Sequence, residues 1–229
     1  MKKLSPKRKP AGKQRVNVPI QTRLDDDRVS ELLDVATEVF IEHGFEGAST
    51  NEIARRANCS KTTLYTRYPT KEKLFLAVLE RRMELILSEF ATTLQPEPPI
   101  EQTLKEYGFH LLQLVLSENQ RGMVRVVSME SSKFPDLAKR FYDLGPGRGA
   151  AILASYMDEQ IKRQRLINEN PQIMAEHLMS LITGGYVRWT LLGLPDNIGL
   201  KEKKQRVSAA IEMFLRAYST QSGTSAKYS

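Results

Sequence analysis

Residues 44–73, GFEGASTNEIARRANCSKTTLYTRYPTKEK, decide the fold of this 229-residue chain. The stretch contains two short helical segments, each preceded by a capping residue. Ser49, with Glu52 three residues later, has the pattern of a capping box at the start of the first helix. Ser60 is placed to cap the second helix, and a proline ends it. Asn58 suits the turn between them, because asparagine tolerates a left-handed backbone. The pattern predicts a helix-turn-helix.

The second predicted helix has a polar face rich in hydroxyls and cations. Such a face at the start of a short helix suits the base edges and phosphates of a DNA major groove. We expect base or methyl contacts from Thr62, Thr63 and Tyr65, and phosphate contacts from Thr50, Ser60, Lys61, Arg67 and Lys71. The alternative is a solvated helix in an ordinary helical protein, since short helix-turn-helix patterns produce many false matches.

A denser set of residues favours the DNA-binding alternative. It comprises Ala36, Phe40, His43-Gly44-Phe45, Ser49-Thr50, Glu52-Ile53-Ala54, Ala57, Ser60-Lys61, Leu64-Tyr65, Tyr68-Pro69 and Lys71-Glu72-Lys73-Leu74. Through these residues the chain, from about Ser30 to about Leu79, resembles the DNA-binding domain of the tetracycline-repressor (TetR/AcrR) family of bacterial transcription regulators. The family usually has Phe where Tyr68 stands. The resemblance implies a sequence-specific DNA-binding regulator, a ligand-relieved repressor that acts as a homodimer on a palindromic operator.

Composition supports an all-α fold. Apolar residues make up 41% and charged residues 27% of the chain, as in ordinary globular proteins. Stretches that alternate between apolar and polar residues are nearly absent, so helices are expected throughout. The apolar runs are too short to cross a bilayer, the N-terminus has no apolar signal segment, and the single cysteine fits a reducing compartment. We therefore expect a cytoplasmic protein with no membrane partner.

The net charge of +7 is concentrated at the N-terminus. Residues 1–23 contain eight Lys or Arg and no Asp or Glu, so the other 206 residues sum to −1. We predict a disordered basic tail over 1–23, a helix-turn-helix DNA-binding domain over 24–73, and a ligand-binding and dimerisation domain over 74–229. A different function also fits the tail, that of an architectural protein that binds DNA without sequence preference.

The second domain is predicted to begin with a long helix, from Thr70 to about Leu94, that links it mechanically to the DNA-binding unit. Further helices are expected at about 100–117, 119–131, 134–144, 147–165, 171–192 and 201–219, with a break or kink at Gly145-Pro-Gly. Between 126 and 166 the chain resembles the ligand-binding region of an AcrR-like branch of the family. The resemblance rests on Glu130, Phe134-Pro135-Asp136-Leu137-Ala138, Phe141-Tyr142 and Gly145-Pro146. It implies an unidentified small-molecule effector.

Two further sets of residues are candidates for this domain. Bulky, adaptable and polar side chains would line a pocket for an apolar or amphipathic effector: Tyr107, His110, Met123, Arg125, Met129, Phe141, Tyr142, Met157 and Trp189. The stripes of the last two helices would form internal core or a dimer interface, and the resemblance implies the interface: Leu178, Ile182, Gly185, Val207, Ile211 and Phe214. The default for any residue on such a stripe is core packing.

No catalytic or metal motif accompanies these features. The sequence has no HExxH, no nucleophile elbow, no P-loop and no acid–histidine cluster with ligand spacing. We expect no enzyme activity, no metal and no cofactor.

Overall fold

The computed structural model describes residues 20–195 and 198–220, and this part of the chain consists of helices joined by turns and loops, with one isolated β-bridge between Leu166 and Ser219. The helices are α1 (Ile20–Gly47), α2 (Thr50–Arg56), α3 (Lys61–Arg67), α4 (Lys71–Thr93), α5 (Ile100–Leu116), α6 (Glu118–Glu130), α7 (Pro135–Tyr142), α8 (Arg148–Lys162), α9 (Pro171–Leu191) and α10 (Leu200–Tyr218). A π-helical turn, Asp143–Gly147, joins α7 to α8 at the predicted break. The all-α prediction is confirmed. No described helix has the length and apolar character needed to cross a membrane.

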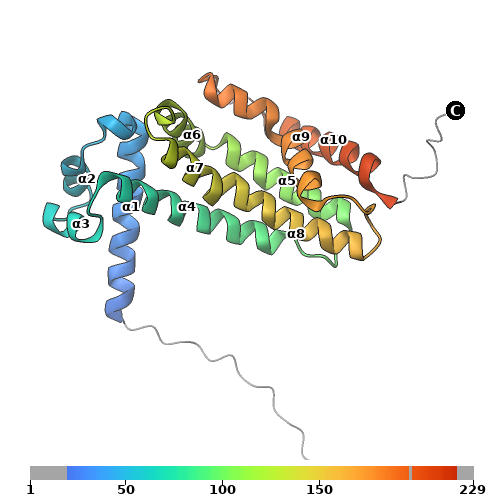
Figure 1. Ribbon diagram of the computed structural model, residues 1–229, viewed down its shortest axis with the longest axis horizontal. Coiled ribbons are helices and arrows are strands. Elements are labelled where there is room, and N and C mark those ends of the chain that lie inside the picture. The colour runs from blue at the N-terminus through green and yellow to red at the C-terminus, as the bar shows by residue number, and fades with distance from the viewer. Residues whose placement is uncertain (1–19, 196–197, 221–229) are drawn as a thin grey trace, which may run out of the picture.

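The helices form an elongated molecule with α1, α2 and α3 gathered at one end (Figure 1). From this end α4 runs into a bundle that contains α5, α6, α8, α9 and α10. The predicted boundary between the two domains, after residue 73, therefore falls inside α4. One continuous helix joins the two units.

Side-chain caps start several of these helices as the sequence predicts. Ser60 Oγ accepts a hydrogen bond from the Thr63 amide at 3.0 Å, and Thr70 Oγ1 accepts one from the Lys73 amide at 3.2 Å. Ser49 is the exception. It occupies the N-cap position of α2, but its side chain accepts no capping hydrogen bond. The predicted capping box is wrong in this respect.

Two hydrophobic cores divide the molecule. One is built from α1 to α4 and also contains Met123, Val126 and Val127 of α6 and Leu137 of α7. The other fills the bundle from the distal half of α4 to α10. The N-terminal helices are therefore packed against α6 and α7, not merely connected to the bundle through α4.

The N-terminal boundary differs from the prediction. Helix α1 begins at Ile20, so residues 20–23, which the sequence assigns to a disordered tail, are helical. Residues 1–19 of the predicted tail lie outside the described residues. The first helix bends at Gly44, where φ is +72°, a conformation that a residue with a Cβ rarely adopts.

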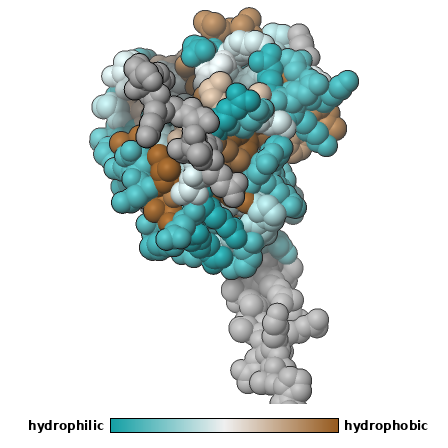
Figure 2. Space-filling view, turned by 90° about the vertical axis from the view of Figure 1, so that its right-hand side faces the viewer, coloured by the Kyte–Doolittle hydropathy of each residue, from teal (hydrophilic) through white to brown (hydrophobic). Residues whose placement is uncertain are grey.

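The predicted dimer-interface side chains need correction. Leu178, Ile182, Val207, Ile211 and Phe214 are buried within a single protomer, because α9 packs against α8 and α5, and α10 packs against α5 and α9. Only Gly185 of the predicted set is exposed. The surface carries a neighbouring stripe instead, with Leu181 42% and Met213 60% exposed. Hydrophobic residues reach the surface along the upper edge of the molecule in Figure 2, the side on which α10 lies in Figure 1.

Candidate nucleic-acid interface

A few apolar side chains on the inner faces of α2 and α3 anchor these helices in the core. Ile53 and Ala54 anchor α2 in the core, and Leu64 anchors α3 with no exposed surface. Asn58 adopts φ of +51° in the turn between them, as the sequence predicts. A seven-residue helix with a single inward anchor presents most of its other side chains to solvent.

The outward face of α3 is the predicted polar face. Its side chains are exposed: Lys61, Thr62, Thr63, Tyr65, Thr66 and Arg67. Together these residues provide hydroxyls, one aromatic ring and two cations on the same short helix. A DNA contact requires this exposure, and a solvated helix in an ordinary helical protein would share it.

Hydrogen bonds inside the protein already orient part of this face. Thr63 Oγ1 lies 2.7 Å from Ser60 Oγ, and Tyr65 Oη lies 2.8 Å from Thr50 Oγ1 of α2. The Lys61 ammonium lies 5.8 Å from the centre of the Tyr65 ring. Ser60 and Thr63 therefore form a cap at the start of α3, whereas Tyr65 is held between the two helices.

Lys71, predicted to contact phosphate, has a different position. Its ammonium donates to the carbonyl oxygens of Glu46 at 2.8 Å and Ala48 at 3.3 Å, and it lies 5.0 Å from the centre of the Phe45 ring. These contacts hold the start of α4 against the end of α1. In the free protein Lys71 is a structural residue.

Arg56 of α2 is also engaged within the protein. Its guanidinium binds both carboxylate oxygens of Glu42, at 3.0 and 2.8 Å, and Glu52 at 2.6 Å. The hydrogen bond from Arg56 lowers the pKa of Glu42, and the two carboxylates raise the pKa of Arg56. Arg56 therefore ties α2 to α1.

A cleft beside α3 brings in Arg28, for which the sequence leaves a phosphate contact and a solvated charge as equal alternatives. The cleft has a volume of about 530 Å³ and lies between α1 and the turn, with Arg28 of α1 and Arg67 of α3 both in its lining. Ser60 and Thr63 also line it. Two cations and two hydroxyls around one opening suit a phosphate group, and one carboxylate, Glu31, also lines the cleft. Spacing in the sequence gives no sign of this arrangement, because Arg28 lies far from α3 along the chain.

The predicted effector-pocket residues do not gather around one cavity. Tyr107 and Met157 belong to the core of the bundle, whereas Met123 belongs to the core of the DNA-binding unit. Met129 is 79% and Tyr142 55% exposed. The remaining four are scattered: Phe141 packs against the second of these cores, Arg125 is half-buried, His110 lines an open groove between α4 and α5, and Trp189 is exposed on α9. Residue type alone does not say which face of a helix a side chain occupies.

Two family models match the chain over most of its length. Residues 32–78 match the model described as bacterial regulatory proteins of the tetR family. Residues 102–220 match the model described as the C-terminal domain of AefR-like transcriptional repressors.

Individual proteins agree with these matches. The transcriptional activator FasR of Mycolicibacterium smegmatis is 38% identical over 80 residues, which cover 35% of this chain and 36% of FasR, so the chain spans about a third of that relative. The crystal structure of a TetR-family regulator from Mesorhizobium loti superposes with a TM-score of 0.80 at 23% identity, covering 85% of this chain and 98% of the other. The flavonoid-responsive regulator FrrA has a TM-score of 0.70 at 27% identity, with coverages of 86% and 99%.

Proposed function

Because the chain belongs to the TetR family of DNA-binding transcription regulators, which are not enzymes, we propose that it is a homodimeric repressor. The dimer binds a palindromic operator in the cytoplasm and releases it when a small molecule binds to the second domain. Repression is favoured by the match to AefR-like repressors over residues 102–220. The single observation that carries the DNA-binding mechanism is the exposed and capped polar face of α3.

On this face we assign separate tasks to the side chains. Thr62 and Tyr65 contact base edges or methyl groups in the major groove, because they are exposed on the outer side of α3. Lys61 and Arg67 contact phosphates, together with Arg28 across the cleft. Thr63 acts mainly by capping α3, since its hydroxyl already binds Ser60.

Homodimerisation is supported by the surface of α9 and α10. A single short recognition helix reads too few base pairs for useful specificity, whereas two copies about 35 Å apart read both halves of a palindrome. Leu181 and Gly185 are exposed on α9, Leu192 is exposed just after it, and Met213 is exposed on α10. We refer to these residues as the exposed stripe. At Gly184 and Gly185 no atom lies within 4 Å of an added Cβ, so another backbone has room to approach.

Relief by an effector requires coupling between the two domains. FrrA is a flavonoid-responsive regulator, and its likeness to this chain supports a small organic effector here. The effector must bind better to a conformation in which the two α3 helices no longer fit successive major grooves. Motion reaches α3 along α4, and through the packing of α6 and α7 on the DNA-binding unit.

Selection of bound fragments from random double-stranded DNA tests the proposal. We expect a palindrome with half-sites one helical turn apart, bound by two chains. Lys61→Ala should weaken binding to all sequences and reduce the salt slope by about one, whereas Thr62→Ala should relax preference at one position per half-site. Equal losses on operator and random DNA for both variants would refute this division of tasks.

The basic tail provides the test against an architectural role. A variant that lacks residues 1–19 should keep its preference for the operator over random DNA and lose part of its non-specific affinity. A protein that coats DNA without sequence preference would lose nearly all binding. Filter binding to the two DNAs at several salt concentrations separates these outcomes.

A further inference from the structure

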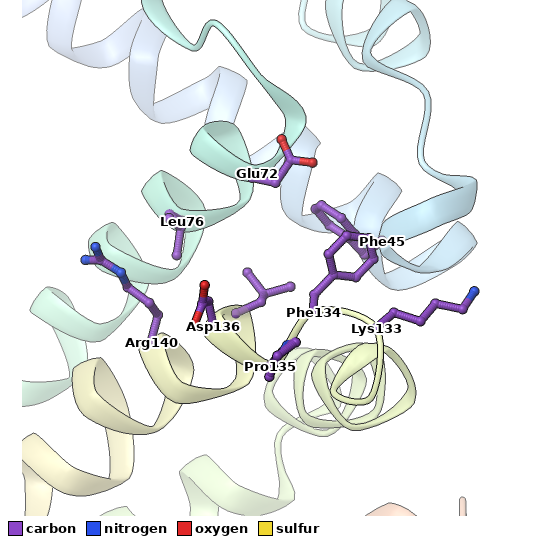
Figure 3. A pocket seen from close by; sticks show the side chains of 9 residues that line it. Phe45, Glu72, Leu76, Lys133, Phe134, Pro135, Asp136 and Arg140 are labelled. Atoms are coloured by element: carbon purple, nitrogen blue, oxygen red, sulfur yellow. The ribbon is translucent and has the colours of Figure 1, made fainter.

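A cleft lies where the DNA-binding unit meets the second domain, away from α3. Its volume is about 350 Å³, within the range of small-molecule sites. Phe45 contributes from the end of α1, Glu72 and Leu76 from the first turns of α4, and residues 133–137 and Arg140 from α7 and the segment before it. Figure 3 shows these side chains around the gap between α4 and α7. The cleft therefore touches both units at once.

The inner surface of this cleft is apolar. Leu76, Phe134, Pro135 and Leu137 line it beside Phe45. The rings of Phe45 and Phe134 pack edge to face, with centroids 5.1 Å apart and an interplanar angle of 72°. This pair is a rigid contact between the end of α1 and the start of α7. An apolar ligand body would lie against a surface that needs little rearrangement.

The charges at the rim are unbalanced. Lys133 is paired with Glu46 at 2.7 Å, and its ammonium points away from the apolar lining (Figure 3). Glu72 is held as an anion, because hydrogen bonds from its own backbone amide and from Thr70 lower its pKa. Asp136 points from α7 toward α4 (Figure 3). Outside the Lys133–Glu46 pair, the lining keeps two carboxylates, Glu72 and Asp136, and one cation, Arg140, while Lys71 lies beside Glu72 without lining the cleft.

We propose that this cleft is a regulatory site for a small organic cation, an amine or quaternary ammonium with a one- or two-ring apolar body. The apolar body lies on the Phe134 and Leu76 surface, and the positive charge lies near Asp136 and Glu72. Aromatic rings attract a cation in addition to the carboxylates. An organic anion of the same shape is repelled by the two carboxylates.

Occupancy of the cleft changes DNA binding, a step that rests on the proposed function. A bound cation bridges α7 to α1 and α4, so it fixes the position of the DNA-binding unit on the bundle. The distance between the two α3 helices of a dimer is then fixed, and the affinity for an operator changes because that distance determines the fit to successive major grooves.

The site itself is tested without DNA. Isothermal titration of the full chain with benzyltriethylammonium should give saturable binding of one cation per chain, and 4-phenylbutyrate should give none. Asp136→Asn and Glu72→Gln should each lower the affinity for the cation by about three- to fivefold, as loss of one partly solvated charge predicts. Asp143→Asn is the matched control: this carboxylate, just after α7, pairs with Lys139 outside the cleft, and its removal should leave binding unchanged.

Several results would overturn the site. They are the absence of saturable binding at millimolar cation, preference for the anion, and unchanged binding to Asp136→Asn. Thermal melts of each variant establish that it is folded.

The regulatory step has a separate readout. With the site confirmed, benzyltriethylammonium should change the operator affinity of the wild-type chain several-fold and leave that of Asp136→Asn much less affected. A change below twofold overturns regulation. A chain that binds the cation but no DNA at all refutes the proposed function and leaves the site standing.

Discussion

At the scale of single residues, the face of α3 that we propose as the DNA contact is partly ordered in the free protein. Tyr65, which we assign to base contacts, is held by Thr50 in a hydrogen bond of 2.8 Å, and the cap residue Thr63 is held by Ser60 at 2.7 Å. A side chain that is already oriented loses less entropy when it contacts a base or phosphate. Lys61 and Thr62 are exposed and remain free to adapt to the groove. The face therefore combines fixed and adjustable contacts.

Lys61→Ala and Lys71→Ala should affect different properties, DNA affinity and stability, although the sequence predicts a phosphate contact for both residues. Lys71→Ala removes two hydrogen bonds to carbonyl oxygens and a cation–ring contact, so we expect the free energy of unfolding to fall by about 1–2 kcal/mol. Lys61→Ala should leave it unchanged and weaken DNA binding. Urea denaturation measures the first effect, with Lys73→Ala, an exposed neighbour on α4, as the control. Equal stability of the Lys71 and Lys73 variants would contradict a structural role.

At the scale of secondary-structure elements, α6 packs closely against α1 at Gly122. A Cβ added at Gly122 of α6 would lie 2.7 Å from Ile41 Cγ2, 3.1 Å from Cγ1 and 3.2 Å from Cδ1. Met123 and Val126, on the same helix, belong to the core of the DNA-binding unit. A shift of α6 therefore moves α1 directly, in parallel with the path along α4.

Gly122→Ala tests this contact. Because the new methyl group would overlap Ile41, we expect a loss of about 1–3 kcal/mol in the free energy of unfolding. In an Ile41→Ala background the same substitution should cost little. Gly149→Ala on α8 is the control, since its Cβ would meet Leu87 at an ordinary 3.7 Å and the alanine favours the helix. Urea denaturation of the wild type and the four variants measures each free energy of unfolding. If Gly122→Ala lowers it by a similar amount in the wild type and in the Ile41→Ala background, contact with Ile41 is not the cause.

Helix positions were predictable from the sequence because they depend on local signals. The predicted 171–192 and 201–219 correspond to α9 and α10 within a residue or so, since caps and apolar periodicity lie in the segments themselves. The partner of each face was not predictable. Leu178 and Ile182 show that α9 buries one side, but the same pattern suits a neighbouring helix or a second copy of the chain. The Arg28–Arg67 cleft was missed for a related reason, because only tertiary packing brings those residues together.

At the scale of the whole molecule, the operator prediction depends on a second copy of the chain. Under the proposed function, the exposed apolar residues of α9 and α10 form the surface on which two protomers pack. A stable homodimer needs roughly 1,000 Å² or more of buried surface, and apolar side chains at its centre. Leu181 and Met213 are exposed apolar residues in this stripe, and Gly184 and Gly185 leave room between them and a partner.

Leu181→Glu should convert the dimer to a monomer without unfolding it. A carboxylate at the centre of a two-fold interface meets its own copy, and like charges in a desolvated contact are strongly unfavourable. Sedimentation equilibrium should show twice the 26.1 kDa chain mass for the wild type and the single mass for the variant, with unchanged helical circular dichroism. Leu85→Glu on α4, where the leucine is 60% exposed outside the stripe, should remain dimeric. The monomer should bind a half-site weakly and lose the advantage of the full palindrome. A Leu181→Glu chain that remains dimeric places the interface on another surface, whereas a monomeric wild type removes the basis for reading a palindrome.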